Sequence, residues 1–386
     1  MDALARLIRA NLATVRTVLI ILGWLLASSS VLAGNRAWES TANEIYGNSS
    51  SSSLTDPSND QQLSKRWLVL DQRNPAIELW DRGHIKVCFD EQHHPIGEKW
   101  IKTEDILRGR LEAARKLWRD FGLDDKDGWF RFEFMDRAFC DDRTRRSEYL
   151  LVEYAGLGNV EMATTVGRLF NPGSNVHWKK AGSRMFLSDS KRVGTGNVVS
   201  NFAHEMGHAW GLQHEHQNPR WWTSEYSKEM TTYPFFGQNW FCKDLADYQM
   251  AVNRVMEDPS FPNKDEGKAA ICTHLTAATR VRFTGAMNWL PRYDAVGPLG
   301  RKEPDWRSIM IYHSRCGGSR PGSRAATVML RNDGREIKRV FRPSQLDIDG
   351  LYELYGRERP KPHFLLQKTN RAFKRVYWKT SRLCSR

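Results

Sequence analysis

The stretch HEMGHAWGLQH at residues 204–214 places three histidines and one glutamate within eleven residues. His204 and His208 are four positions apart, so on a helix they lie on one face, one turn from each other. Two imidazoles at that spacing can bind one tetrahedral zinc ion through their ring nitrogens. We therefore predict a zinc-binding helix at this point of the chain.

The rest of the stretch supports a catalytic rather than a structural zinc site. Glu205 adjoins the first histidine, and a carboxylate there can take a proton from a water whose pKa zinc lowers to about 7. Gly211 can adopt the left-handed conformation that ends many helices, which would return His214 as a third ligand. Three protein ligands leave the fourth position open. A surface helix with scattered histidines is the alternative, but five fixed positions would rarely coincide by chance.

The pattern HExxHxxGxxH resembles the signature of metzincin zinc endopeptidases, and Glu215 follows the third histidine as in the astacin-like group. The later segment SIMIY at 308–312 resembles the family's Met-turn. The resemblance implies that Met310 forms an apolar floor beneath the imidazoles and that Tyr312 lies near the metal and assists the transition state. It also implies that Glu215 anchors the mature amino terminus, a role that the altered residues after Glu215 leave open.

The resemblance implies an α+β fold of the metzincin (zincin) type. That fold has a twisted mixed β-sheet, two long helices, the zinc helix at the cleft and a C-terminal helix. Residue periodicity independently predicts strands within 78–90, 129–135, 149–154 and 185–187, and helices over 103–121 and 344–355. The second helix would begin at a Ser-x-x-Asp cap on Ser344. The zinc helix is expected to start near residue 196. By resemblance, residues 163–168 form the edge strand above the cleft, with a loop as the alternative.

Residues 217–306 depart from the family pattern. Met310 lies 96 residues after His214, a longer separation of the third histidine and the Met-turn than is usual in the family. We predict a helical insertion there, with helices over 244–257 and 266–282 and one disulfide that staples it. Its aromatic residues either form a small core or line a substrate pocket.

The first 33 residues have the three parts of a secretory signal: a basic start, an apolar core and small residues before a cleavage point at Ala33. A retained signal anchor is the alternative, although the apolar run is short for a membrane span. We therefore expect a secreted, extracellular protein with no stable membrane span. Residues 34–66 read as a disordered, propeptide-like segment, and Lys65-Arg66 is either a processing site or an ordinary dibasic pair. The catalytic domain would then span 67–356.

All six cysteines lie beyond the leader. In an oxidising compartment they are expected to form three disulfides whose pairing the sequence does not decide. These cysteines are Cys88, Cys140, Cys242, Cys272, Cys316 and Cys384.

The formal net charge of the 386-residue chain is +13. Such a charge favours binding to acidic surfaces or polyanions and does not by itself indicate specific nucleic-acid binding. Residues 357–386 form a basic tail, which is either a polyanion-binding arm or a segment that Cys384 ties back to the body.

Together these features predict a secreted zinc-dependent endopeptidase that acts on proteins or peptides. His204, His208 and His214 would hold Zn²⁺, Glu205 would deprotonate the attacking water and Tyr312 would assist. The alternative is a secreted basic binding or adhesion protein with a non-catalytic zinc site, and the intact Glu205 counts against it.

Overall fold

The computed structural model describes residues 69–70, 77–156, 162–169, 181–227, 234–292, 295–296, 302–320 and 325–358. The expected signal peptide at 1–33, the segment 34–66 with its dibasic pair, and nearly all of the basic tail lie outside these residues. The expected division into domains is therefore still a prediction. No helix of the described part is both long and apolar enough to cross a membrane.

The described chain is a mixed α+β structure built around a five-stranded sheet with the order β6-β3-β7-β10-β8. The first four strands run parallel, and β8 pairs antiparallel with β10 at one edge. These strands are β3 (Ile85–Phe89), β6 (Phe132–Phe134), β7 (Tyr149–Tyr154), β8 (Ala163–Thr164) and β10 (Arg184–Leu187). Each expected strand is present, and the predicted range of β7 is the observed one. The edge position of β8 favours the edge-strand interpretation of residues 163–168 over a loop.

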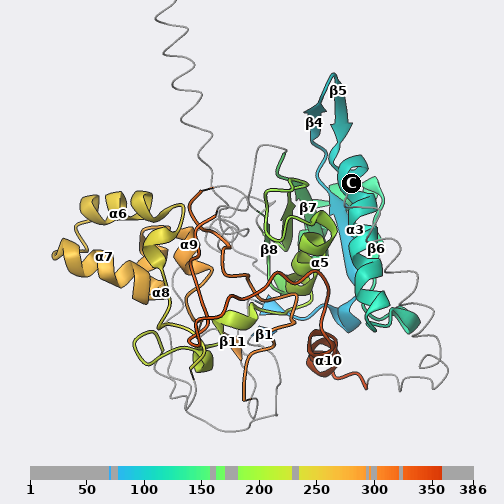
Figure 1. Ribbon diagram of the computed structural model, residues 1–386. Coiled ribbons are helices and arrows are strands. Elements are labelled where there is room, and N and C mark those ends of the chain that lie inside the picture. The colour runs from blue at the N-terminus through green and yellow to red at the C-terminus, as the bar shows by residue number, and fades with distance from the viewer. Residues whose placement is uncertain are drawn as a thin grey trace, which may run out of the picture.

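Two long helices pack against each other and against the sheet (Figure 1). They are α3 (Thr103–Asp120) and α5 (Val198–Ala209), as the apolar periodicity predicts. Trp118 of α3 donates its indole N–H to the carbonyl of Ala203 in α5 at 2.9 Å, and its ring meets that of Trp210 edge-on at 5.5 Å. The two helices therefore share one core, and α5 is completely buried from Ser200 to Ala209.

The closing helix α10 (Gln345–Leu354) begins at the expected Ser344 cap. The hydroxyl of Ser344 accepts the backbone N–H of Asp347, and the Asp347 carboxylate accepts the backbone N–H of Ser344. This reciprocal pair satisfies two of the orphan N–H groups at a helix start.

Four α-helices lie between α5 and residues 308–312 in the described chain, to one side of the sheet (Figure 1). They are α6 (Tyr248–Glu257), α7 (Lys264–Thr273), α8 (Leu275–Arg280) and α9 (Thr284–Met287). We call residues 242–292, which include these helices, the helical region. The expected single helix over 266–282 is wrong. It breaks at His274, whose backbone is extended (φ −122°, ψ 121°) and whose ring bonds to the hydroxyl of Thr273 at 2.7 Å.

The remaining described elements are short. The strands are β1 (Val69–Leu70) with β11 (Ala295–Val296), β2 (Ile77–Glu78) with β9 (Arg168–Leu169), and the hairpin β4 (His93–Ile96) with β5 (Lys99–Lys102). A five-residue helix, α4 (Arg137–Asp141), follows β6.

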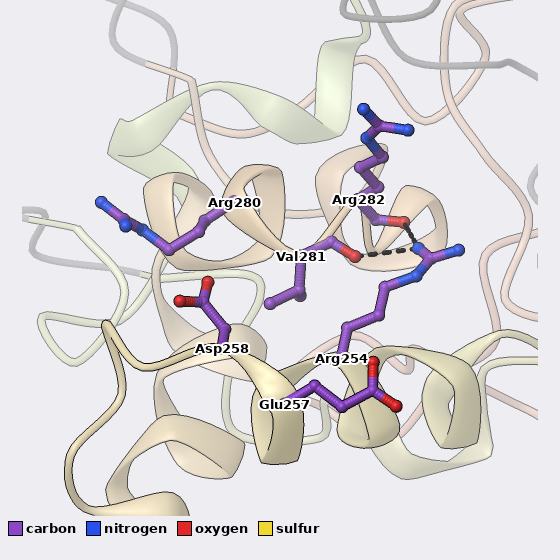
Figure 2. Close-up of a pocket in the computed structure, with 6 residues that line it drawn as sticks. All are labelled: Arg254, Glu257, Asp258, Arg280, Val281 and Arg282. Carbon is purple, nitrogen blue, oxygen red and sulfur yellow. Dashed lines mark hydrogen bonds between the residues drawn. The ribbon is translucent and has the colours of Figure 1, made fainter.

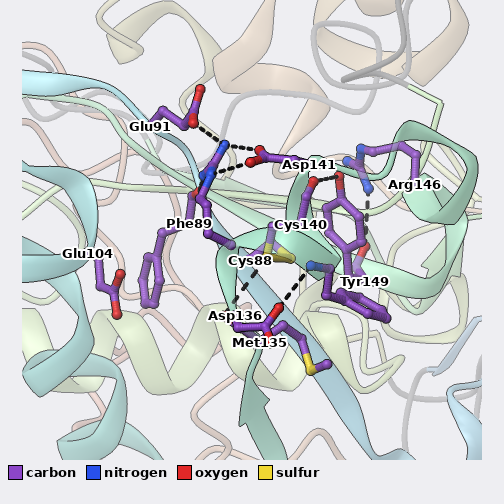
Figure 3. The surroundings of a disulfide bond; sticks show 12 residues. Cys88, Phe89, Glu91, Glu104, Met135, Asp136, Cys140, Asp141, Arg146 and Tyr149 are labelled. Atoms are coloured by element: carbon purple, nitrogen blue, oxygen red, sulfur yellow. Dashed lines mark hydrogen bonds and ion pairs between the residues drawn. A yellow bond between two sulfur atoms is a disulfide. The ribbon is translucent and has the colours of Figure 1, made fainter.

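Two disulfides are present in the described chain. Cys88 of β3 joins Cys140 of α4 with a Cα–Cα distance of 5.6 Å (Figure 3). Around it lies a small apolar cluster with Tyr149, whose hydroxyl donates to the carbonyl of Cys140 at 3.2 Å. Cys242 joins Cys272 within the helical region, as expected for a stapled insertion. A third pair is not tested, because Cys384 lies outside the described residues.

Candidate metal centre

Helix α5 and the turn after it determine where the three histidines lie. Asn197 caps the helix by accepting the backbone N–H of Ser200 at 3.0 Å. The helix ends at Ala209, and Gly211 has a φ of +100°, a left-handed conformation that glycine adopts without a steric penalty. The backbone N–H of Gly211 donates to the carbonyl of His208 at 2.8 Å. This turn brings His214 back toward the helix, as the sequence predicts.

The three histidines are buried and face one another through the same ring atom. The Nε2 atoms of His204 and His208 are 3.1 Å apart, those of His208 and His214 3.2 Å, and those of His204 and His214 3.3 Å. Tetrahedral zinc with Zn–N bonds of about 2.0–2.1 Å separates its nitrogen ligands by roughly 3.3–3.4 Å. The triangle therefore has nearly the size that one zinc ion requires.

Each ring is oriented by a hydrogen bond on its other nitrogen. Nδ1 of His204 donates to the carbonyl of Ile309, Nδ1 of His208 to the carbonyl of Leu212, and Nδ1 of His214 to the side-chain oxygen of Gln217, all at 2.7 Å. Because these oxygens only accept, the single proton of each neutral ring lies on Nδ1. Three Nε2 lone pairs then converge without a proton between them, an arrangement that fits a bound cation.

Glu205 is buried beside the first histidine. Its Oε2 accepts a hydrogen bond from the hydroxyl of Thr164 at 2.6 Å. Thr164 belongs to the edge strand β8, so this contact joins the carboxylate to the strand at the edge of the sheet. No sequence pattern marks Thr164 as a partner of Glu205, because the two residues lie 41 positions apart.

The Met-turn lies against the same group of rings. Gly207 lies between His204 and His208 in the sequence. A Cβ placed on it would be 2.6 Å from Sδ of Met310, so the methionine side chain packs directly against the helix at this glycine. The ring of Tyr312 is buried with its centroid 4.5 Å from that of His214 and 6.1 Å from that of His204. Met310 therefore packs against α5, and Tyr312 lies beside two of the three rings. Their expected roles at the metal are still predictions.

Asp347 anchors the Met-turn from the closing helix. Its carboxylate accepts the hydroxyl of Ser308 at 2.6 Å and the backbone N–H of Ile309 at 2.9 Å. Burial, reinforced by the negative charge of Asp305, raises the pKa of Asp347 to about 6. Because the carbonyl of Ile309 holds His204, this carboxylate fixes the first ring indirectly.

Glu215 does not join the converging nitrogens. Its Oε1 accepts the backbone N–H of Asp305 at 2.8 Å. This hydrogen bond holds the backbone three residues before the Met-turn. The expected role of Glu215 at the mature amino terminus involves Trp67, which lies outside the described residues.

His216 lies directly behind the third histidine. It is fully buried, and its ring stacks on that of His214 with centroids 5.0 Å apart. Nε2 of His216 donates to the carbonyl of Asn288 at 2.9 Å, and its Nδ1 accepts the backbone N–H of Tyr312 at 3.3 Å. His216 is therefore a packing residue behind the third ring.

Other histidines of the described chain lie apart from this group. His84 pairs with Glu133 at 2.8 Å, and His94 bonds to the hydroxyl of Thr103 at 3.0 Å. Among the described residues, His204, His208 and His214 are the only group of histidine, cysteine or acidic side chains that converges closely enough to bind a metal.

A pocket of about 360 Å³ lies in the helical region and not at the histidines (Figure 2). The guanidinium of Arg254 donates there to the carbonyls of Val281 and Arg282, both at 2.9 Å. The aromatic residues of the insertion contribute to the core: Phe236 is fully buried and lies against Trp222 and Trp306.

No family model matches the chain, and no curated protein matches its sequence. Among solved structures it is similar to High choriolytic enzyme 1, a hatching enzyme zinc-protease from Oryzias latipes (Medaka fish), at 13% identity and a TM-score of 0.35. That match covers 78% of this chain and 100% of the enzyme. Two structures of myroilysin match at 13% and 14% identity with TM-scores of 0.37 and 0.36. They cover 75% and 74% of this chain, and 99% and 88% of their own chains.

Proposed function

We propose that the protein is a zinc-dependent endopeptidase that hydrolyses protein or peptide substrates. The observation that supports this most directly is the triangle of Nε2 atoms, 3.1–3.3 Å apart, on three rings whose Nδ1 protons point outward to oxygens. His204, His208 and His214 are the proposed ligands. When bound, zinc supplies a Lewis acid that acidifies water and polarises a carbonyl.

The proposed proton carrier is Glu205. It takes a proton from the attacking water and delivers it to the leaving amine, so one carboxylate serves both halves of the reaction. The hydrogen bond from the Thr164 hydroxyl holds Oε2 of this carboxylate in a fixed position beside the first histidine. Tyr312 is proposed to donate its hydroxyl to the developing oxyanion from beside His214.

The edge strand β8 is the proposed substrate platform. β8 lies at the end of the sheet next to α5, and an extended peptide can add to a strand edge through main-chain hydrogen bonds. Because Thr164 belongs to β8 and contacts Glu205, a peptide paired with this strand would lie near the carboxylate.

We assign the enzyme to the metzincin type on the motif at 204–214 and the Met-turn at 308–312, with the astacin-like group as the nearest subtype. We also propose that it is secreted. The leader-like first 33 residues and the disulfides Cys88–Cys140 and Cys242–Cys272 support this.

The deciding experiment compares the wild type with Glu205→Gln on casein and on a peptide library, with zinc content measured for both. We expect both proteins to bind about one zinc, and cleavage only by the wild type. Glu112→Gln, a change at an exposed acid of α3, serves as the matched control and should cleave normally. Equal cleavage by Glu205→Gln removes Glu205 from the mechanism. Zinc binding without cleavage by the wild type favours a binding protein with a non-catalytic site.

A further inference from the structure

Gln217 is the buried hydrogen-bond partner of the third histidine. Its side-chain nitrogen donates to the carbonyls of Met287 at 2.9 Å and Leu290 at 3.0 Å. Because carbonyl oxygens only accept, the amide group of Gln217 must face these two carbonyls, and its oxygen must face His214. That oxygen accepts Nδ1–H of His214 at 2.7 Å. The orientation of the side chain thus fixes which nitrogen of His214 carries the proton.

The carbonyls that hold Gln217 belong to residues 287–292. We call these residues the closing segment, because they run from the last residue of α9 to the end of the helical region. The closing segment makes further bonds around the site. The backbone N–H of Arg292 donates to the carbonyl of Gln217 at 2.9 Å, and the carbonyl of Asn288 accepts Nε2–H of His216. The segment is therefore joined to both residues that follow Glu215.

The same segment also reaches the Met-turn. Trp289 is fully buried, and its indole N–H donates to the carbonyl of Cys316 at 3.1 Å. Its ring lies 4.7 Å from that of His216 and 5.6 Å from that of Tyr312. Displacing the closing segment would disturb the surroundings of His214 and Tyr312 together.

We infer that Gln217 is a positioning residue that couples the zinc site to the closing segment: it holds His214 ready to bind zinc and transmits zinc binding to residues 287–292. This inference rests on the zinc site of the proposed function. Outer partners of metal-bound histidines change metal affinity when they are removed. By thermodynamic linkage, an element that strengthens zinc binding must itself be stabilised by zinc to the same extent.

Two substitutions separate the two ends of the Gln217 side chain. Gln217→Met removes the acceptor for His214 and the donor for the closing segment. Gln217→Glu keeps an oxygen against His214 and replaces the donor with a second acceptor opposite two carbonyls. Gln345→Met, at an exposed glutamine of α10, makes the same chemical change away from the site.

Zinc affinity is measured by competition with a chelator on the full chain, and the visible absorption of the cobalt-loaded protein reports the ligand geometry. We expect Gln217→Met to weaken zinc binding about 10- to 100-fold, with an altered cobalt spectrum. Gln217→Glu should bind zinc as tightly as the wild type or more tightly, because a carboxylate partner raises the basicity of the ring. Equal affinities for Gln217→Met and Gln345→Met would overturn the positioning role.

Coupling is measured by amide hydrogen exchange with and without zinc. In the wild type we expect zinc to slow exchange in the closing segment and to leave α7, which belongs to the same helical region, unchanged. In Gln217→Glu that protection should disappear while zinc still binds. Closing-segment exchange that is insensitive to zinc in the wild type would overturn the coupling, and this test holds even where a variant does not fold.

None of these measurements requires peptide cleavage. A wild-type protein that binds zinc without cleaving peptides refutes the peptidase proposal and leaves the coupling result standing. A wild type that binds no zinc overturns the site and the coupling together.

Discussion

Asp347 and His313 are two buried titratable side chains that should give the stability of the protein opposite pH dependences. Asp347 lies beneath the Met-turn, where burial and then the charge of Asp305 raise its pKa from 3.8 to about 6. The folded-state pKa lies above the unfolded value. Its contribution to stability is therefore fully present below pH 3.8 and is lost as the pH rises through about 6.

His313 has the opposite shift. Its Nε2 donates to the carbonyl of Gly194 at 3.2 Å, and its Nδ1 accepts the backbone N–H of Arg315 at 3.2 Å. Burial, and then the positive charge of Arg339, lowers its pKa from 6.5 to about 4. Its contribution is present above pH 6.5 and is lost as the pH falls through about 4.

The two effects are similar in size. Each shift is about 2 pKa units, which corresponds to about 3 kcal/mol of unfolding free energy. Between about pH 4 and pH 6 the two groups change the unfolding free energy in opposite directions, by roughly 1.4 kcal/mol per pH unit each. In the wild type the two slopes should nearly cancel.

The assay is urea unfolding of the metal-free protein at several pH values between about 4 and 7. From the lower to the upper end of this range, the stability of Asp347→Asn relative to the wild type should rise by about 3 kcal/mol. The relative stability of His313→Gln should fall by a similar amount. Gln345→Met, which changes no titratable group, serves as the control. Curves for both variants that run parallel to the wild-type curve would refute the reasoning.

Three further outcomes follow from single contacts. Thr164→Val should lower the kcat of peptide cleavage about 10- to 100-fold, since a hydrogen bond to a charged group contributes about 1.5–3 kcal/mol. Thr164→Ser, which keeps the hydroxyl, should restore most of the rate. Steady-state peptide kinetics measure both, and an unchanged kcat for Thr164→Val would contradict the role of this hydrogen bond. Gly207→Ala should cost about 1–3 kcal/mol by displacing Met310, and an unchanged Tm would contradict that packing. Replacing Cys88 and Cys140 together by alanine should lower the unfolding free energy by about 2–5 kcal/mol in urea unfolding. An unchanged unfolding midpoint would contradict a stabilising role for this disulfide.

The sequence predicts well those features that neighbouring residues determine. The four-residue spacing of His204 and His208, the left-handed turn at Gly211 and the Ser344 cap each depend on a few consecutive positions, and all three are observed. The strand over 149–154 is also predicted with its observed bounds, because five of its six residues are apolar or aromatic.

Features that depend on distant partners could not be read in the same way. Thr164 meets Glu205 only because β8 pairs antiparallel with β10 beside α5. Gln217 lies only three residues after His214, but the carbonyls that orient its side chain reach it only after four α-helices have returned the chain to the site. A single threonine or glutamine has no periodicity, so its side chain gains a role only from tertiary packing. The break between α7 and α8 was missed for a related reason, since helical periodicity continues across His274.

The three rings show how a local motif depends on the whole chain. Nδ1 of His208 bonds within the motif, to Leu212, four residues away. Nδ1 of His204 bonds to the Met-turn, which Asp347 of α10 holds in place. Nδ1 of His214 bonds to Gln217, which the end of the helical region holds. The sequence motif supplies the three imidazoles. The orientations of His204 and His214 also depend on segments more than 70 residues further along the chain, directly for His204 and through Gln217 for His214. Asp347 of the closing helix and the closing segment of the helical region are therefore structural supports of the candidate metal centre.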